Sequence, residues 1–198
     1  MNFTDPEYRS AIGELVRDVF HFGLKSWAEM FAIETTVLGG GARLLRCQME
    51  LVCRMVGNGA LMRTKLEGFH TAPIHFAFPQ GLLGSAVGRA LMLPSGDDTE
   101  LDSADEFQVE AVQELMNLFC GSATQALQDY SHLELRLSQS VDDLCVDVGG
   151  VRKMRLHEGR PLLCVHVDVQ IGERKSRTWC LLDPEGATTL SAAYTMRK

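Results

Sequence analysis

A hydrophobic pattern with a helical period opens the chain. Apolar side chains recur three or four positions apart over residues 12–31. Residues 4–7, Thr-Asp-Pro-Glu, supply a capping box with a proline in the first turn, so a helix is predicted from this point. The glycine run at 39–41 follows no predicted strand and lacks the lysine of a phosphate-binding loop. It is therefore expected to form a flexible turn that ends the segment.

Strand-like alternation follows in two blocks. In the first block, apolar and polar residues alternate over 45–53, and further apolar runs cover 61–66 and 74–78. The connections are too short for helical crossovers, so the strands are expected to pair antiparallel. Gly57-Asn58-Gly59, Gly149-Gly150 and Gly172-Glu173 read as turns. The second block contains the predicted strands 144–148, 151–156, 162–171 and 178–182.

Two further helices are predicted between these blocks. A short one covers 81–93 and leads into a loop at 94–98, and a long one covers about 103–130, with Ser103 and Glu106 as its capping box. The order of helix, strands, two helices and strands predicts an α+β fold, in which helices pack on one face of an antiparallel sheet. No low-complexity linker divides the chain, so residues 1–198 are expected to form a single domain.

Composition narrows the classes of partner. A net charge of -7 with scattered basic residues argues against nucleic acid as a partner. The one basic group, Arg174, Lys175 and Arg177, is expected at a hairpin tip. No apolar run is long enough to span a bilayer, and the first ten residues lack the features of a signal peptide, so a cytoplasmic protein without a membrane partner is expected. The six cysteines form no C-x-x-C pair and predict reduced thiols.

The long helix over 103–130 divides into two faces at about 100° per residue. Asparagine is unfavourable inside a helix, and an interior glycine costs about 1 kcal/mol relative to alanine. Both residue types occur on the face that is expected to be exposed, so this face suggests a carboxylate, an amide and a gap presented to a partner. The apolar face consists of Val109, Val112, Leu115, Met116, Phe119, Ala123, Ala126 and Leu127, and the opposite face of Glu110, Glu114, Asn117, Gly121 and Gln128.

Residues 114–121, Glu-Leu-Met-Asn-Leu-Phe-Cys-Gly, resemble the E-x-x-N-x-x-x-G signature of the chemotaxis phosphatases CheX and CheC. The layout of the whole chain is also similar to a CheX-like protein, although the sequence resemblance is confined to residues 102–127. Members of this family remove the phosphoryl group from the response regulator CheY. The resemblance implies that Asn117 orients the attacking water and that Glu114 pairs with the partner's active-site lysine. Gly121 would allow close approach, and Glu110 would belong to the partner-binding surface.

The same resemblance implies the partners and the cofactors. The partner would be a phosphorylated CheY-like response regulator that holds its own Mg²⁺, so this chain would need no cofactor. A homodimer through an exposed sheet edge is also expected. The alternative is a non-catalytic adaptor of the same fold, in signalling or in a flagellar switch.

CheC-type proteins carry two such motifs, whereas CheX-type proteins carry one. Residues 11–17, Ala-Ile-Gly-Glu-Leu-Val-Arg, are similar to residues 111–117, Ala-Val-Gln-Glu-Leu-Met-Asn. This similarity suggests an internal repeat in which Arg17 stands where the amide would be. One complete motif favours the CheX-like interpretation.

Other groups of reactive residues are interpreted as structural. Cys164, His166 and Asp168 alternate along one predicted strand and would share a face, as metal ligands do, but no second cluster completes a site. His70 and His75 flank a turn at Pro73 and have no carboxylate nearby in the sequence. No metal site is therefore predicted. An unrelated metal enzyme would require these residues to converge in space.

Overall fold

The computed structural model describes residues 5–57, 59–67, 71–92, 105–131, 136–138, 144–145 and 159–195. The strands within these ranges form one sheet, in the order β1-β6-β7-β3-β2-β4, with β5 also paired to β2. All of these pairings are antiparallel. The strands are β1 (Thr35–Arg46), β2 (Ala60–Glu67), β3 (Ala72–Phe78), β4 (Arg136–Ser138), β5 (Leu144–Cys145), β6 (Pro161–Ile171) and β7 (Arg174–Leu182).

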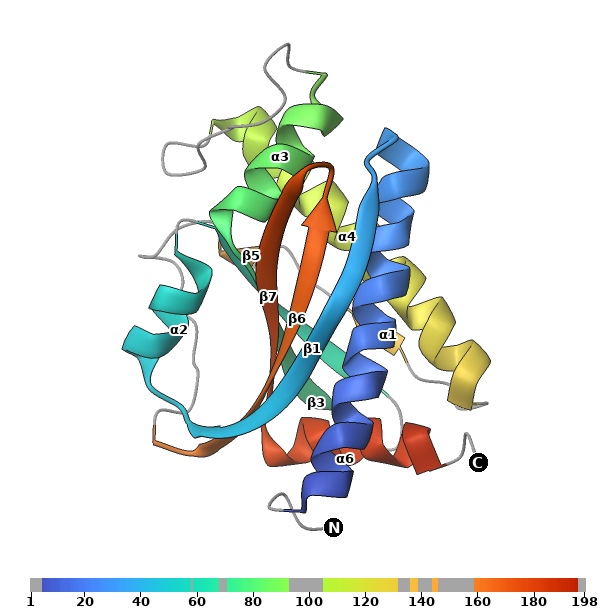
Figure 1. Ribbon diagram of the computed structural model, residues 1–198, viewed down its shortest axis with the longest axis vertical. Helices are drawn as coiled ribbons and strands as arrows, with labels where there is room; N and C mark the ends of the chain where they lie inside the picture. Colours follow the sequence, from blue (N-terminus) through green and yellow to red (C-terminus); the bar gives the residue numbers. More distant parts are fainter. Residues whose placement is uncertain are drawn as a thin grey trace.

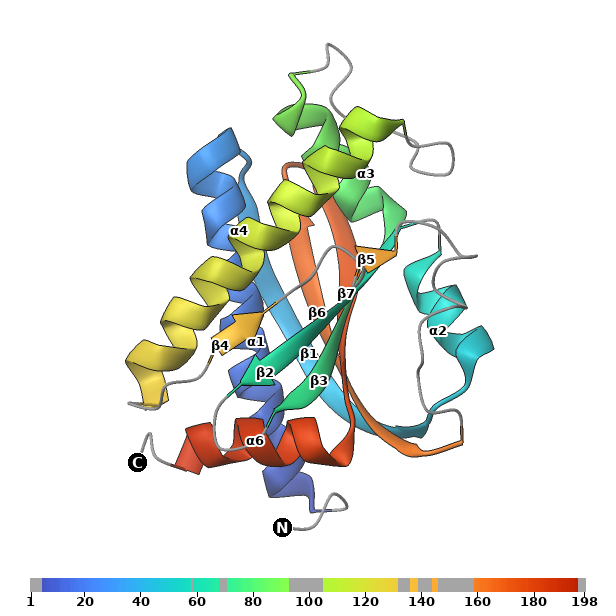
Figure 2. The ribbon, with the colours of Figure 1, turned by 180° about the vertical axis from the view of Figure 1, so that it is seen from behind.

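Helices cover one face of this sheet and part of the other (Figures 1 and 2). The main core lies between the sheet and four helices: α1 (Pro6–Phe31), α3 (Gln80–Ala90), α4 (Glu106–Ser131) and α6 (Pro184–Thr195). A smaller cluster on the opposite face, which we call the outer face, is covered by α2 (Met49–Val56). The predicted α+β class with helices packed on an antiparallel sheet is confirmed, and α2 adds a helix on the outer face.

The alternation of side chains along β6 explains this arrangement. Leu163, Val165 and Val167 point into the main core, whereas Leu162 and Cys164 belong to the cluster beneath α2. Because successive side chains of a strand point to opposite faces, one strand serves both clusters. The polar residues of β6 therefore lie on the part of the outer face beyond α2.

The described elements repeat in order. Each half of the chain begins with a long helix, continues with strands and ends with a shorter helix, although α2 interrupts the strands of the first half. β7 of the second half pairs with β3 of the first at the centre of the sheet. The long helices α1 and α4 each contain 26 residues and begin 100 positions apart, at Pro6 and Glu106. The suspected repeat between residues 11–17 and 111–117 therefore coincides with equivalent places in two structural halves.

Both long helices are capped by an aspartate. In α1, Asp5 is the N-cap and its carboxylate accepts the Glu7 backbone N–H at 2.9 Å, with proline in the first turn as predicted. In α4, Asp105 accepts the Gln108 N–H at 2.9 Å, and the Gln108 side chain accepts the Asp105 N–H at 3.1 Å. The pair forms a reciprocal capping box. The capping boxes predicted from Thr4 and Ser103 were wrong, because Asp5 caps α1 and Asp105 pairs with Gln108 at the start of α4.

The prediction of a flexible turn at 39–41 was wrong. These glycines lie inside β1 and pair with β6, next to an irregularity between Val37 and Gly39. A Cβ at Gly40 would overlap the His166 carbonyl oxygen, and one at Gly41 would lie 2.9 Å from the His166 ring. Close packing against β6 therefore requires glycine at position 40 and restricts position 41, whereas a Cβ at Gly39 would have no heavy atom within 4 Å. The helix itself ends earlier, at Phe31, and Ala32 follows with φ 52°.

The predicted strand over 45–53 was wrong beyond Arg46, where β1 ends and α2 soon begins. Val52, Cys53 and Val56 are buried at helical spacing, and a short segment can satisfy either period until its neighbours select one. The basic group predicted at a hairpin tip, Arg174, Lys175 and Arg177, instead lies within β7, and the turn itself is formed by Gly172 and Glu173. Neither α6 nor β4 was predicted.

The remaining predicted elements agree with the structure where it describes them. β2, β3, α3, α4, β6 and β7 coincide with predicted segments, and Gly57 ends α2 with φ 57°. The predicted loop 94–98, the Gly149-Gly150 turn and the strand 151–156 lie outside the described residues. Free thiols are found at Cys47, Cys53, Cys120, Cys164 and Cys180. Among the described helices, none has the length and apolar character needed to cross a membrane.

Candidate functional site

The exposed face of α4 carries the residues that the sequence selected. Glu110, Glu114, Asn117 and Gly121 are all exposed, on the side of the helix turned away from the sheet. Gln128, which was placed on the same stripe, is half-buried, and Gln125, one turn after Gly121, is exposed instead. The opposite side of α4 is buried in the main core, through Val112, Leu115, Met116, Phe119, Cys120, Ala123, Ala126 and Leu127.

The two polar side chains at the centre of this face are available to a partner. Within the described part of the chain, neither the Glu114 carboxylate nor the Asn117 amide makes a hydrogen bond or an ion pair. An intramolecular network would have restrained them and blocked contact with another molecule. Their exposure and lack of described partners satisfy the geometric requirement for a residue that acts on a docked protein.

Packing against the described residues does not require glycine at position 121. A Cβ at this position would have no heavy atom within 4 Å, and the residue lies in the middle of a helix. Gly23 of α1 differs, because a Cβ there would overlap the Phe119 ring where the two helices pack. Glycine weakens a helix by about 1 kcal/mol relative to alanine, and packing against the described residues does not account for this cost at position 121.

The buried side of α4 holds this surface rigidly. The Trp27 indole N–H of α1 donates to the Leu115 carbonyl oxygen at 2.6 Å, directly beside Glu114. Phe119 packs edge-on against Phe20, Phe76 and Phe78, with ring centroids 5.2–5.4 Å away. Aromatic pairs at these separations add to the stability of a core. Contacts on the buried side of α4 therefore hold in place the backbone that carries Asn117.

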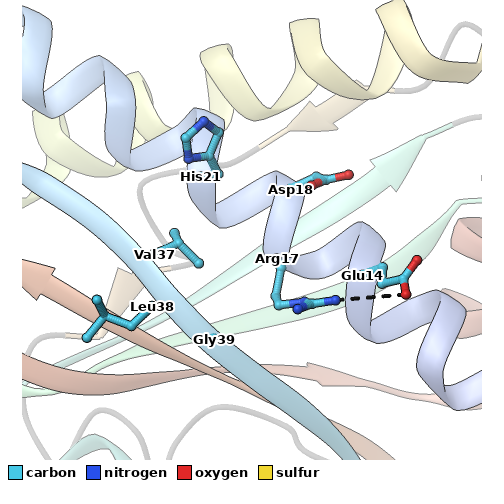
Figure 3. Close-up of a pocket in the computed structure, with 7 residues that line it drawn as sticks. All are labelled: Glu14, Arg17, Asp18, His21, Val37, Leu38 and Gly39. Atoms are coloured by element: carbon cyan, nitrogen blue, oxygen red, sulfur yellow. Dashed lines mark ion pairs between the residues drawn. The ribbon is translucent and has the colours of Figure 1, made fainter.

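The equivalent surface of α1 is built differently (Figure 3). Glu14, Arg17 and His21 stand 100 positions before Glu114, Asn117 and Gly121. Arg17 Nη2 lies 4.0 Å from Glu14 Oε1, with the two side chains 39% and 47% exposed. These residues line a cavity of about 390 Å³ between α1 and β1, which also includes Asp18 and the backbone of Gly39. The amide is absent here, so among the described residues the complete motif lies on α4.

The other candidate groups remain apart from this surface. His166 and Asp168 share the outer face with Cys164, but the described residues contain no group of three side chains able to hold a metal. Burial and the nearby Arg177 cation lower the pKa of His166, while a hydrogen bond from Arg177 lowers the pKa of Asp168. Burial also raises the pKa of the Cys164 thiol to about 12, which makes it a poor metal ligand or nucleophile. His75 is buried in β3, and His70 lies outside the described residues.

No protein-family model and no curated protein sequence matches this chain. Solved structures do. FliY of Thermotoga maritima superposes with a TM-score of 0.79 at 15% identity, over 100% of both chains. The FliM middle domain of H. pylori gives a TM-score of 0.73 at 5% identity, over 96% of this chain and 99% of that one. The chemotaxis protein CheX of Desulfovibrio desulfuricans gives 0.52 at 13% identity, over 86% and 99%.

Because the sequence identities are low, these similarities establish the fold and nothing further. The chain has the CheC/CheX/FliM type of fold, as the resemblance of residues 114–121 implied. A fold of this type carries more than one function, so the activity has to be argued from the surface of α4.

Proposed function

We propose that this chain is a phosphatase that dephosphorylates a phosphorylated, CheY-like response regulator in a chemotaxis or two-component pathway. The observation that supports the proposal is the exposed stripe of Glu114, Asn117 and Gly121, whose two polar side chains have no partner in the described chain. Phosphoryl transfer needs positioning and charge stabilisation more than covalent chemistry from the protein, and such a stripe can supply the positioning.

In this mechanism α4 docks over the active site of the regulator. The Asn117 amide holds a water in line with the aspartyl phosphate and adds no negative charge that would repel it. The water oxygen attacks phosphorus, the bond between phosphorus and the aspartate oxygen breaks, and inorganic phosphate and a free carboxylate result. Glu114 pairs with the regulator's lysine, while Gly121 permits close approach and Glu110 extends the contact surface. The Mg²⁺ belongs to the regulator, so this chain supplies no cofactor.

The second candidate function is a non-catalytic adaptor in signalling or in a flagellar switch. The observation that favours it is structural: the TM-scores with FliY and FliM, 0.79 and 0.73, exceed the 0.52 with CheX. Two of the similar H. pylori structures are complexes of FliM with FliG and with SpeE. An adaptor would use the same exposed helix for binding without hydrolysis. In either case we expect a cytoplasmic location and a homodimer.

The test is the decay of acyl-phosphate-labelled response regulators from the same organism, with and without this chain. The wild type should accelerate decay of its cognate regulator. Asn117→Ala should reduce the accelerated rate of decay by about 10²-fold or more, because the attacking water is no longer held in position. Gln48→Ala is the matched control, because Gln48 is an exposed amide that makes no cap hydrogen bond at the start of α2.

The outcomes separate the two functions. Decay that depends on Asn117 and not on Gln48 supports the phosphatase. Binding of a regulator without any acceleration of decay supports the adaptor. Acceleration that persists in Asn117→Ala would refute the assignment of the chemistry to α4.

A further inference from the structure

A second polar pocket lies between α1 and the edge strand β1, away from the exposed stripe of α4. Its volume is about 340 Å³. Five residues of α1 line it, and Gly40, Gly41 and Ala42 form the side contributed by β1. The α1 residues are Pro6, Arg9, Ser10, Gly13 and Arg17. The pocket adjoins the cavity of Figure 3, with Arg17 contributing to both.

The charged side chains that line this pocket are both positive. Arg9 and Arg17 are the charged residues in its lining, and no carboxylate is among the described lining residues. The two arginines are eight positions apart, which places them about 12 Å apart along the helix axis. They therefore border the pocket at two points along the helix.

One of these donors lacks an acceptor. The Nε atom of Arg9 is buried and has no hydrogen-bond partner within the described part of the chain. A guanidinium carries five N–H donors and no acceptor, and a buried donor without an acceptor is unfavourable. Because this atom has almost no accessible surface, a ligand oxygen in the pocket would reach it only after the Arg9 side chain turns toward the pocket.

Glycines line this pocket on both the α1 side and the β1 side. The Arg17 Cδ atom would lie 3.4 Å from a Cβ at Gly40, and that Cβ would also overlap the His166 carbonyl oxygen. At Gly13, a Cβ would reach Ala42 at 3.6 Å, an ordinary packing distance. A side chain at Gly13 would thus be tolerated, but it would occupy the space between the two arginines.

We propose that the pocket between α1 and β1 binds a phosphate group, as inorganic phosphate or as a phosphate monoester, through Arg9 and Arg17. Two guanidinium groups match a dianion in charge, and arginine binds phosphate oxygens with two parallel hydrogen bonds. Glu14 lies 4.0 Å from Arg17 Nη2 and competes with the ligand for this cation. The proposal rests on the α1–β1 pocket alone and does not require any phosphatase activity of α4.

The test is isothermal titration of the full chain with inorganic phosphate and with O-phosphoserine, at constant ionic strength. Saturable binding is expected, with Arg9→Met and Arg17→Met each weakening it at least about tenfold, since each substitution removes charge-assisted hydrogen bonds to the ligand. Glu14→Gln should strengthen binding. Arg54→Met is the matched control, because Arg54 is an exposed arginine of α2 that is paired with Glu50 at 3.7 Å.

Circular dichroism of each variant verifies that the fold is retained, and Arg17 is exposed enough for its loss to be tolerated. Tighter binding of O-phosphoserine than of inorganic phosphate would support a monoester, and equal binding would support recognition of the phosphate group itself. The proposal is overturned if neither ligand saturates the wild type, if both arginine variants bind like Arg54→Met, or if malonate binds as tightly as phosphate.

Discussion

The two long helices have the same length and the same buried pattern, yet their exposed faces differ. Ile12, Leu15 and Val16 of α1 are buried, and so are their counterparts 100 positions later in α4. On the outside, α4 presents a carboxylate and an amide without described partners, whereas α1 pairs Glu14 with Arg17 and Lys25 with Glu29. The shared core constrains the buried positions of both helices, and the exposed positions are free to acquire different chemistry.

The largest effect should come from exchanging glycines in the two helices for alanine. Gly23→Ala would force a Cβ into the Phe119 ring, so we expect a loss of about 1–3 kcal/mol from overpacking. Gly121→Ala has open space around it and should stabilise the helix by up to about 1 kcal/mol. Urea denaturation of both variants measures the difference.

A destabilised Gly121→Ala would show that this glycine has an internal structural role and would weaken the case for a docking surface. If the phosphatase proposal holds, the same stabilised variant should dephosphorylate the regulator more slowly, because the added methyl group separates α4 from its partner.

A transfer of the motif tests whether the two helices are equivalent surfaces. In an Asn117→Ala background, Arg17→Asn with His21→Gly places the complete motif on α1 next to Glu14. We expect a few-fold recovery of regulator decay above that background, since the backbone of α1 is in the equivalent place. Arg17→Ala with His21→Gly, which lacks the amide, should give no recovery. If the two double variants behave alike, α1 is not a functional equivalent of α4.

The smallest expected effect is on the pH dependence of stability, through His166 and Asp168 of β6. Burial lowers the pKa of His166 below 6.5, so the native state favours the neutral ring, and its contribution to stability should be lost as the pH falls through the pKa of the unfolded histidine. His166→Gln should remove this dependence between about pH 7 and about pH 5 in urea denaturation. The pKa of Asp168 is lowered by Arg177, so its contribution is lost only below about pH 4. An unchanged slope in His166→Gln would assign the dependence to other groups.

The candidate site could be read from the sequence because a helical period assigns faces. Once residues 103–130 were recognised as an amphipathic helix, the apolar stripe implied the burial of Leu115 and Phe119, and hence the exposure of Asn117. The pocket of Arg9 and Arg17 was missed. The spacing of Arg9, Gly13 and Arg17 was a signal on the helix, but the β1 side of the pocket is formed by glycines that were taken for a turn.

The sequence alone determined the elements whose own period decides their conformation: the two long helices and strands β2, β3, β6 and β7. Tertiary contacts decided the rest. The segment that became α2 is too short for its pattern to choose between helix and strand, and its burial against the outer face selected the helix. The glycines of β1 have no side chains to signal a strand, and they are extended because β6 pairs with them at distances that leave no room for a Cβ at Gly40.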